Sequence, residues 1–243
     1  MPRTAFLGPA YTFTERAAHA LRPDDELMAH DNVAGVIGAL AQGEAENAVC
    51  ALENSAAGYV DALLSALAAQ TAPFAVADEH VEPIRFSLYR CEGDFGPLTA
   101  VTADVMGLKQ TQGWIAAHGL EARPAESNGH AFLAVRECGA SGLGAIAPAD
   151  LRAEGVIATD TDLQGAGVNH TRFVLLTRPA PGETARALVQ SDALAAFAKA
   201  MRPHLFKVCG PNGGFAETAW DEPVTRAALE AAARPLLLWG AGG

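Results

Sequence analysis

Short apolar segments alternate with segments of helical periodicity along the first part of the chain. Thr4–Leu7 and Asn47–Leu52 are apolar runs of the length expected for buried strands. Asn32–Leu40 lies between them and places apolar side chains three and four residues apart, as one face of an amphipathic helix does. Thr14–Leu21 and Gly58–Leu67 also have helical character. Strands that alternate with helices favour a parallel sheet covered on both faces, so the predicted fold class is α/β.

The middle of the chain continues this alternation less regularly. Gly107–His118 fits a helix, and Pro148–Leu151 is predicted to start another. Arg172–Leu176 is a good strand by its β-branched and apolar content. Further short strands are expected at Phe74–Val76, Phe86–Tyr89, Leu98–Val101 and Gly144–Ile146, and a helix at Ala131–Arg136.

A linker rich in proline and glycine, Pro179–Gly182, precedes a tail with its own order of elements. The tail pattern predicts strand, helix, strand, strand, helix and strand, which is the ferredoxin-like arrangement. Its two middle strands are expected to join at Pro211–Gly214. The predicted strands are Arg186–Val189, Leu205–Val208, Phe215–Thr218 and Leu236–Trp239, and the predicted helices are Ala193–Met201 and Thr225–Ala233.

Composition limits the classes of function. Half of the 243 residues are hydrophobic, which is enough for a large core in one large domain or two modest ones. The formal net charge of -11 repels phosphate backbones, so we expect no nucleic-acid partner, and any anion site must be built locally. The four cysteines are far apart and show no metal-ligand spacing, so we expect free thiols and no metal. The chain shows neither a signal peptide nor a membrane-spanning run, so we expect a soluble, cytoplasmic protein without a membrane partner.

Three stretches together resemble the prephenate dehydratase family. Leu7–Glu15 reads LGPAYTFTE and is similar to the family's opening G-P-x-G-T-F-[ST]. Leu52–Val60 reads LENSAAGYV and is similar to E-N-[ST]-x-x-G-x-V, and Asn169–Phe173 reads NHTRF and is similar to N-x-T-R-F. Each motif alone is a weak signal, but chance agreement of all three in this order and spacing is improbable.

The resemblance implies a fold and an assembly. Residues 1–178 would form a catalytic region of two α/β lobes like a type II periplasmic binding protein, with substrate between the lobes. Lobe 1 would comprise about 1–76 and 156–178, and lobe 2 about 77–155. Residues 183–243 would form a ferredoxin-like, ACT-like α+β domain, and association through such domains implies a homodimer or homotetramer. An allosteric amino acid is a further possible partner, but the tail lacks the E-S-R-P run that the family uses for phenylalanine, which leaves feedback by phenylalanine in doubt.

The family's reaction removes water and carbon dioxide from prephenate and gives phenylpyruvate in phenylalanine biosynthesis, without a metal or organic cofactor. The resemblance therefore implies a small-molecule substrate, prephenate or a close analogue, and no cofactor. Thr171 would be the catalytic residue, donating a hydrogen bond to the leaving hydroxyl that strengthens as charge builds. The alternative is that Thr171 is an ordinary strand residue chosen for its β propensity.

The residues next to Thr171 have more than one interpretation. Because side chains alternate along a strand, Arg172 should point to the opposite face from Thr171 and either contact a substrate carboxylate through a twist or pair with an acidic residue. Phe173 returns to the Thr171 face as core or as a wall of the pocket.

Glu53, Asn54 and Ser55 end a predicted strand and are expected to open into a helix, a place where α/β folds bind ligands. Asn54 and Ser55 are candidate substrate-binding residues, with helix capping as the alternative. Glu53 would repel an anionic substrate and is expected to orient a neighbour, either Arg172 or a backbone amide. Thr12 could bind a carboxylate or cap its helix. Gln110 matches a family glutamine that would contact substrate, or is an exposed helix residue.

Several positions depart from the family pattern. Tyr11 replaces a glycine, and a tyrosine lacks glycine's freedom at positive φ. Ala103 and Asp104 stand where the family has serine and histidine, and Ser127–Ala131 departs from S-T-x-x-A.

These departures from the family pattern leave other functions open. The chain could prefer arogenate, whose ammonium group would suit Asp104, it could bind small molecules without catalysis, or it could be a decarboxylase relative that retains the ring hydroxyl.

Overall fold

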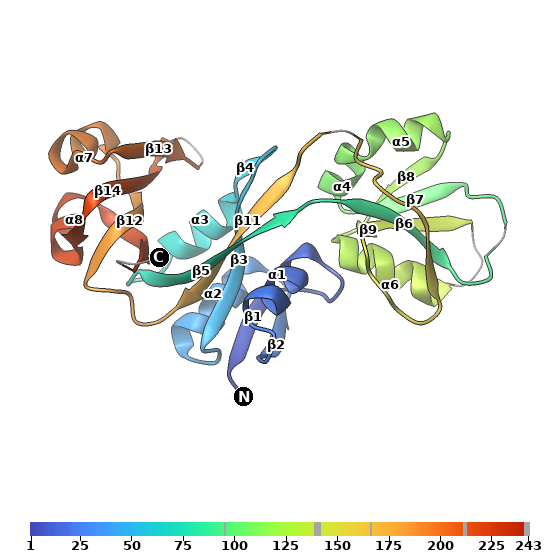
Figure 1. Cartoon of the computed structure of the whole chain (residues 1–243), viewed down its shortest axis with the longest axis horizontal. Coiled ribbons are helices and arrows are strands. Elements are labelled where there is room, and N and C mark those ends of the chain that lie inside the picture. Colours follow the sequence, from blue (N-terminus) through green and yellow to red (C-terminus); the bar gives the residue numbers. More distant parts are fainter. Residues whose placement is uncertain (95, 139–141, 166, 211–212, 241–243) are drawn as a thin grey trace. The chain divides into compact units, whose positions relative to one another are not determined.

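The computed structural model describes residues 1–94, 96–138, 142–165, 167–210 and 213–240, and the chain divides into two compact units. The first unit contains Met1–Leu7, Ala17–Glu82 and Thr171–Gly243. The second contains Gly8–Arg16 and Pro83–His170. Each unit has its own sheet with helices beside it, as Figure 1 shows, so the predicted α/β class is confirmed. The predicted domain boundaries, including the one between 178 and 183 inside the first unit, stay predictions.

The first unit is built on a mixed sheet. In it β1 (Arg3–Leu7) lies parallel to β2 (Glu26–His30) and to β3 (Asn47–Asn54), as the alternating pattern predicts. By contrast, β11 (His170–Thr177) runs antiparallel to β3, so the sheet is not parallel throughout. The remaining elements of this part are α1 (Phe13–Leu21), α2 (Val33–Gln42), β4 (Gly58–Tyr59), α3 (Asp61–Ala68) and β5 (Phe74–Pro83).

The core of this part forms where α2 and α3 bury apolar faces beside the strands. Ile37 and Leu40 of α2 and Leu63 and Leu64 of α3 are fully buried in one hydrophobic cluster. The side chain of Asn32 caps α2 by accepting a hydrogen bond from the Gly35 N–H, which fixes where this helix begins.

The tail has the predicted strand–helix–strand–strand–helix–strand order. The order of its strands in the sheet is β13-β14-β12-β15, which is that of a ferredoxin-like domain. Its last strand, β15, pairs in parallel with β5. The tail therefore extends the sheet that carries β3 and β11. Its elements are β12 (Glu183–Gln190), α7 (Leu194–Met201), β13 (Leu205–Cys209), β14 (Phe215–Thr225), α8 (Arg226–Ala232) and β15 (Arg234–Trp239). Of the predicted turn, Pro211 and Asn212 lie outside the described residues.

The second unit has a five-stranded sheet in the order β10-β6-β9-β7-β8. Its central strands are parallel where β7 pairs with β8 and β9, and antiparallel where β6 pairs with β9 and β10. Its elements are β6 (Phe86–Cys91), β7 (Ala100–Ala103), α4 (Val105–Gln110), α5 (Gln112–Ala117), β8 (Glu121–Pro124), α6 (Asn128–Cys138), β9 (Leu143–Pro148) and β10 (Val156–Asp160).

Three predicted helices differ from the structure. Residues 148–151 form no helix, because the chain turns at Asp150, whose φ is 67°. The helix predicted over 107–118 is interrupted at Thr111, whose hydroxyl donates to the Gly107 carbonyl at 2.8 Å. The helix predicted from Gly58 begins only at Asp61, because Gly58 and Tyr59 pair with β3.

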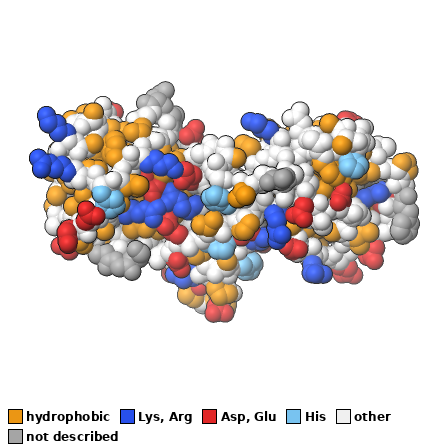
Figure 2. All heavy atoms as spheres, turned by 45° about the horizontal axis from the view of Figure 1, so that its top comes forward, with side chains coloured by type: hydrophobic (Ala, Val, Ile, Leu, Met, Phe, Trp, Pro, Cys, Tyr) orange, Lys and Arg blue, Asp and Glu red, His pale blue; other side chains and the backbone are white. Residues whose placement is uncertain are grey.

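The expectations from composition concern the cysteines, membrane-spanning helices and the acidic charge. Cys50, Cys91 and Cys209 are free thiols, and the side chain of Cys138 lies outside what the structure describes. Within the described part of the chain, no helix has the length and apolar character needed to cross a membrane. On the face drawn in Figure 2, acidic and basic side chains gather beside one another, so the acidic net charge does not form a uniform field there.

Candidate active site

Thr171 and Asn54 face each other across the β11–β3 pair. Thr171 is 8% exposed, and its hydroxyl oxygen accepts a hydrogen bond from the Asn54 side-chain amide at 3.0 Å. The Asn54 carbonyl oxygen accepts from the backbone N–H groups of Ala56 and Ala57 at 2.9 and 3.0 Å, which fixes the direction of the amide. Since the Thr171 oxygen accepts from Asn54, its own proton is directed elsewhere and is available to donate.

The turn after Asn54 differs from the predicted helix start. Ser55 lies exposed in this turn, and the following helix begins only at Asp61. The free N–H groups of a helix start therefore do not support ligand binding at Asn54 and Ser55. The Asn54 side chain still forms hydrogen bonds to both the turn and the Thr171 hydroxyl.

Arg172 points to the face opposite Thr171, as alternation predicts, and pairs with acidic residues there. Its Cα partner is Glu53, and its guanidinium contacts the Glu53 carboxylate at 3.2 Å. Glu53 thus contacts one of the neighbours that it was expected to orient, and its role stays a prediction. A change of register follows directly, between Arg172 and Phe173. Phe173 is 2% exposed and packs as core.

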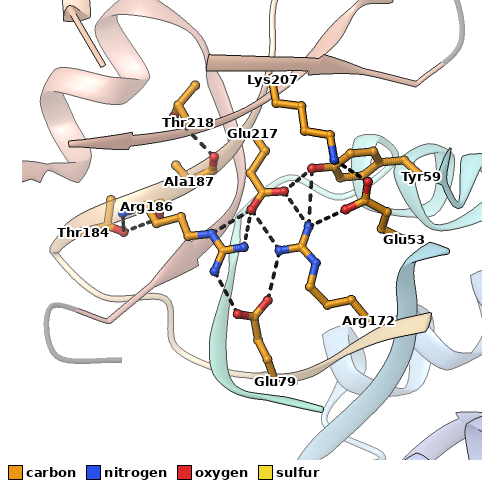
Figure 3. A network of polar contacts seen from close by, with 10 residues as sticks. All are labelled: Glu53, Tyr59, Glu79, Arg172, Thr184, Arg186, Ala187, Lys207, Glu217 and Thr218. Carbon is orange, nitrogen blue, oxygen red and sulfur yellow. Dashed lines mark hydrogen bonds and ion pairs between the residues drawn. The ribbon is translucent and has the colours of Figure 1, made fainter. Parts of the chain in front are cut away.

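Arg172 belongs to a network that joins three strands of the tail to β3, β4, β5 and β11 (Figure 3). Glu217 of β14 accepts from both terminal nitrogens of Arg172, at 3.0 and 2.6 Å, and from Nε of Arg186 at 2.7 Å. Glu79 of β5 also bridges the two arginines, at 3.3 and 2.8 Å. The network is completed by Lys207, which pairs with Glu53, and by the Tyr59 hydroxyl, which donates to Glu217.

The charges of this network are matched around Glu217, which is buried, whereas the other members are partly or more exposed. Burial raises the pKa of Glu217, but hydrogen bonds from Arg172 and Tyr59 and the charges of Arg172 and Arg186 outweigh it, and the pKa falls to about 2. Burial and the hydrogen bond to Glu217 raise the pKa of Tyr59, which keeps this phenol neutral. Apart from Glu53 and Arg172, the members of this network were not predicted from the sequence. The one available signal was the glutamate at Glu217 inside a short apolar strand.

Two predicted binding residues, Thr12 and Gln110, lie in the second unit with partners of their own. The Thr12 hydroxyl accepts from the Glu15 N–H at 3.2 Å and donates to the Pro9 carbonyl at 3.3 Å, so Thr12 is the N-cap of α1. The Gln110 carbonyl oxygen accepts from the Asn169 side-chain amide at 2.9 Å. Gln110 is therefore bonded to the first residue of the N-x-T-R-F motif, two positions before Thr171.

Asp104 is the N-cap of α4 and is partly buried. Its carboxylate accepts from the Gly107 N–H at 2.8 Å, and its own N–H donates to the Asn128 side chain at 3.3 Å. Burial raises the pKa of Asp104, although the hydrogen bonds from Gly107 and Asn128 act in the opposite direction. A side chain at position 107 would lie 2.6 Å from the Asp104 carboxylate, so glycine is needed for this arrangement.

Tyr11 adopts a positive φ, although a tyrosine lacks glycine's freedom in this region. Its φ is 66°, and its N–H donates to the Glu15 carboxylate at 2.6 Å. The ring packs 4.6 Å from the Phe132 ring, and its hydroxyl accepts from Arg136 at 3.2 Å. Contacts with α6 and Glu15 thus offset a backbone conformation that costs about 1–2 kcal/mol outside glycine.

The motifs of both units fall within one family match. A family model described as prephenate dehydratase matches residues 4–181. The chain belongs to the prephenate dehydratase family. Among curated members, the prephenate dehydratase of Amycolatopsis methanolica is 31% identical over 181 residues and that of Mycolicibacterium vanbaalenii is 32% identical over 199 residues. Each match covers 74% of this chain but only 59% and 63% of the relative, so the chain spans about three fifths of their length.

Solved structures share the prephenate dehydratase fold over nearly the whole chain. The prephenate dehydratase of Arthrobacter aurescens in complex with L-Phe is 21% identical, with a TM-score of 0.78 over 98% of this chain and 90% of that chain. GqqA, described as a novel type of quorum quenching acylase, is 23% identical, with a TM-score of 0.77 over 99% and 98%. The Staphylococcus aureus prephenate dehydratase is 20% identical, with a TM-score of 0.72 over 98% and 100%.

Proposed function

We propose that this chain is a carbon–oxygen lyase that converts prephenate into phenylpyruvate, carbon dioxide and water. Family membership supports the reaction class, and the curated relatives bear the same name. The observation that carries the proposal is the Thr171 hydroxyl, which accepts from Asn54 at 3.0 Å and so retains its proton for a substrate oxygen.

The bonds that break and form in this reaction belong to the substrate, so the protein needs to supply little covalent chemistry. The bond between the ring and its carboxylate breaks, carbon dioxide leaves, and the electron pair enters the ring. The bond between the opposite ring carbon and its hydroxyl breaks as the ring becomes aromatic. The hydroxyl leaves as water after it gains a proton that ultimately comes from solvent. Thr171 donates the hydrogen bond that stabilises the charge building on this oxygen.

Substitution of Thr171 tests the role of its hydroxyl. Thr171→Val keeps the shape of the side chain and removes the donor, so kcat for phenylpyruvate formation should fall about 100- to 1000-fold. Thr171→Ser keeps the hydroxyl and should retain most of the activity. If Thr171→Val turns over prephenate like the parent chain, the assignment of Thr171 is wrong.

Asp104 supports arogenate as an alternative substrate. A carboxylate in the second unit would attract the ammonium group that distinguishes arogenate from prephenate. Asp104→Asn keeps the hydrogen bond to Gly107, because asparagine caps helices as well as aspartate does. The variant should therefore lose kcat/KM for arogenate and keep it for prephenate.

A side-by-side product assay separates these functions from the others. Prephenate giving phenylpyruvate supports the dehydratase, and arogenate giving phenylalanine at the higher kcat/KM supports the alternative. A product that retains the ring hydroxyl would indicate a decarboxylase. Binding of either compound without any product would indicate a binding protein of this family.

A further inference from the structure

Glu217 of the tail holds Arg172 more firmly than any other acidic residue does among those described. It is 3% exposed, and its two carboxylate oxygens accept from the two terminal nitrogens of Arg172 at 3.0 and 2.6 Å. This paired geometry fixes the plane of the guanidinium as well as its position. Arg186 of β12 holds Glu217 from the other side, through Nε at 2.7 Å.

The network leaves Arg172 little freedom to move. Its acidic members are Glu53, Glu79 and Glu217, and its basic members are Arg172, Arg186 and Lys207, so the charges balance (Figure 3). Glu53 and Glu79 contact Arg172 at 3.2 and 3.3 Å from β3 and β5. Arg172 is thus held from β3 and β5 and from the tail together.

Arg172 and Thr171 are consecutive residues on β11 whose side chains point to opposite faces. The ladder between β11 and β3 pairs Thr171 with Asn54 and Arg172 with Glu53, and its register changes at the next residue. Thr171 is also the residue at which the chain enters the first unit from the second. This end of the strand is therefore fixed by side chains, through Asn54 on one face and the network on the other. A rotation of the strand that released Arg172 would also turn the Thr171 hydroxyl.

We propose that Glu217 is a positioning residue for catalysis, which holds Arg172 from the tail and thereby fixes the orientation of the Thr171 hydroxyl. The inference rests on the proposed function of Thr171. The family match ends at residue 181, so the tail supplies a determinant of the active site that lies outside it. The tail then completes the catalytic region, whatever else it binds.

A double-mutant cycle between Glu217 and Thr171 tests the coupling. Glu217→Gln removes the charge at constant shape, and kcat should fall about tenfold or more, while KM changes less than about threefold. In a Thr171→Val background the same change should lower kcat less than about twofold, because no hydroxyl is left to position. Glu222→Gln, on an exposed part of β14, is the matched control and should leave kcat unchanged. An equal loss in both backgrounds, or no loss in the first, overturns the proposal.

A readout without turnover keeps this inference separate from the proposed function. The methyl group of Thr171 can be followed by NMR after selective 13C-methyl labelling of threonine, with its signal assigned by its loss in Thr171→Val. Glu217→Gln should shift or broaden that signal, and Glu222→Gln should leave it in place. If the parent chain turns over neither prephenate nor arogenate, the proposed function fails. The positioning role of Glu217 is then rejected only if Glu217→Gln leaves the Thr171 signal unperturbed.

The variant Glu217→Asp is used if Glu217→Gln does not fold. It keeps the charge on a shorter side chain, and full kcat with an unchanged Thr171 signal in that variant overturns the proposal.

Discussion

Asn54 determines the direction in which the Thr171 hydroxyl can donate. The amide gives its N–H to the threonine oxygen and uses its carbonyl oxygen to hold the turn at Ala56 and Ala57. An aspartate at this position would keep the turn but would accept the threonine proton instead of donating to the oxygen. We predict that Asn54→Asp lowers kcat about 100-fold and more than Asn54→Ala does. Steady-state assays of phenylpyruvate formation measure both, and an Asp variant as active as the Ala variant would contradict this assignment.

Tyr11 offers a test of strain at a single residue. Its left-handed backbone favours glycine, whereas its ring contacts Phe132 and Arg136. Tyr11→Ala loses the ring and keeps the strain, but Tyr11→Gly loses the ring and relieves the strain. We therefore predict that Tyr11→Gly is more stable than Tyr11→Ala by about 1 kcal/mol, the reverse of the usual order for these residues. Urea unfolding at neutral pH compares the two variants, and a less stable Gly variant would contradict the strain argument.

Local patterns predicted some of these residues but not their partners. Thr171 and Asn54 lie in short motifs, and alternation along β11 predicted that Arg172 points away from Thr171. The partners of Arg172 could not be predicted in this way, because Glu217 lies 45 positions away in sequence and Glu53 lies 119 positions away. Local periodicity carries no information on pairings between distant strands.

At the scale of elements, buried strands were predicted well, and three largely exposed strands were missed. β1 and β3 were found because most of their side chains are buried. β2, β8 and β10 were not predicted, and all four side chains of β8 are exposed. Their backbones pair with β1, β7 and β6, so hydrogen bonds to neighbours hold them rather than an apolar face. Such pairing leaves no hydrophobic pattern in the sequence.

The network between β11 and β14 should make stability depend on pH in a defined range. The pKa of Glu217 lies at about 2 in the folded chain, against an ordinary value of 4.5. Because the folded pKa is the lower one, the stabilisation is present above pH 4.5 and is lost as the pH falls through about 2. This difference in pKa corresponds to a stabilisation of the folded chain by about 3 kcal/mol at neutral pH and by about half of that at pH 3.

Glu217→Gln tests this pH dependence. The variant should be less stable than the parent by about 3 kcal/mol at pH 7, because two partly buried arginines lose a charged partner. This difference in the free energy of unfolding should narrow towards pH 3, because protonation of Glu217 makes the parent resemble the variant. Urea unfolding at a series of pH values measures the gap, with Glu222→Gln as the exposed control. A gap that stays constant with pH would show that Glu217 is not ionised in the way the network requires.

At the scale of the whole molecule, the tail is joined twice to the rest of the first unit. The backbone of β15 pairs with β5, and the Glu217 network contacts β11, so both a sheet ladder and an ion network cross from one part to the other. The ferredoxin-like order was predictable because the tail strands and helices each have a clear periodicity. The shared sheet was not, because the parallel pairing of β15 with β5 joins segments far apart in sequence.

The prediction of a homo-oligomer can be tested at β13, the strand at the edge of this sheet. Among the described residues β13 pairs only with β14, so its other side offers unpaired backbone groups. Leu205 and Val208 on this strand are 42% and 52% exposed, which is unusual for apolar side chains beside an open edge. A second copy that paired with this strand would satisfy its backbone groups and cover part of both side chains, which lie on opposite faces of the sheet.

Charge placed on β13 should therefore prevent assembly. We predict that the parent chain is a dimer or tetramer at micromolar concentration and that Val208→Lys shifts it to the monomer, because the lysine would be buried unpaired against the second copy. Val168→Lys is the matched control, since Val168 is 91% exposed and lies outside β13. Light scattering coupled to size-exclusion chromatography gives the mass of each variant. A monomeric parent, or a Val208→Lys variant with the parent's mass, would show that this edge is not the contact between subunits.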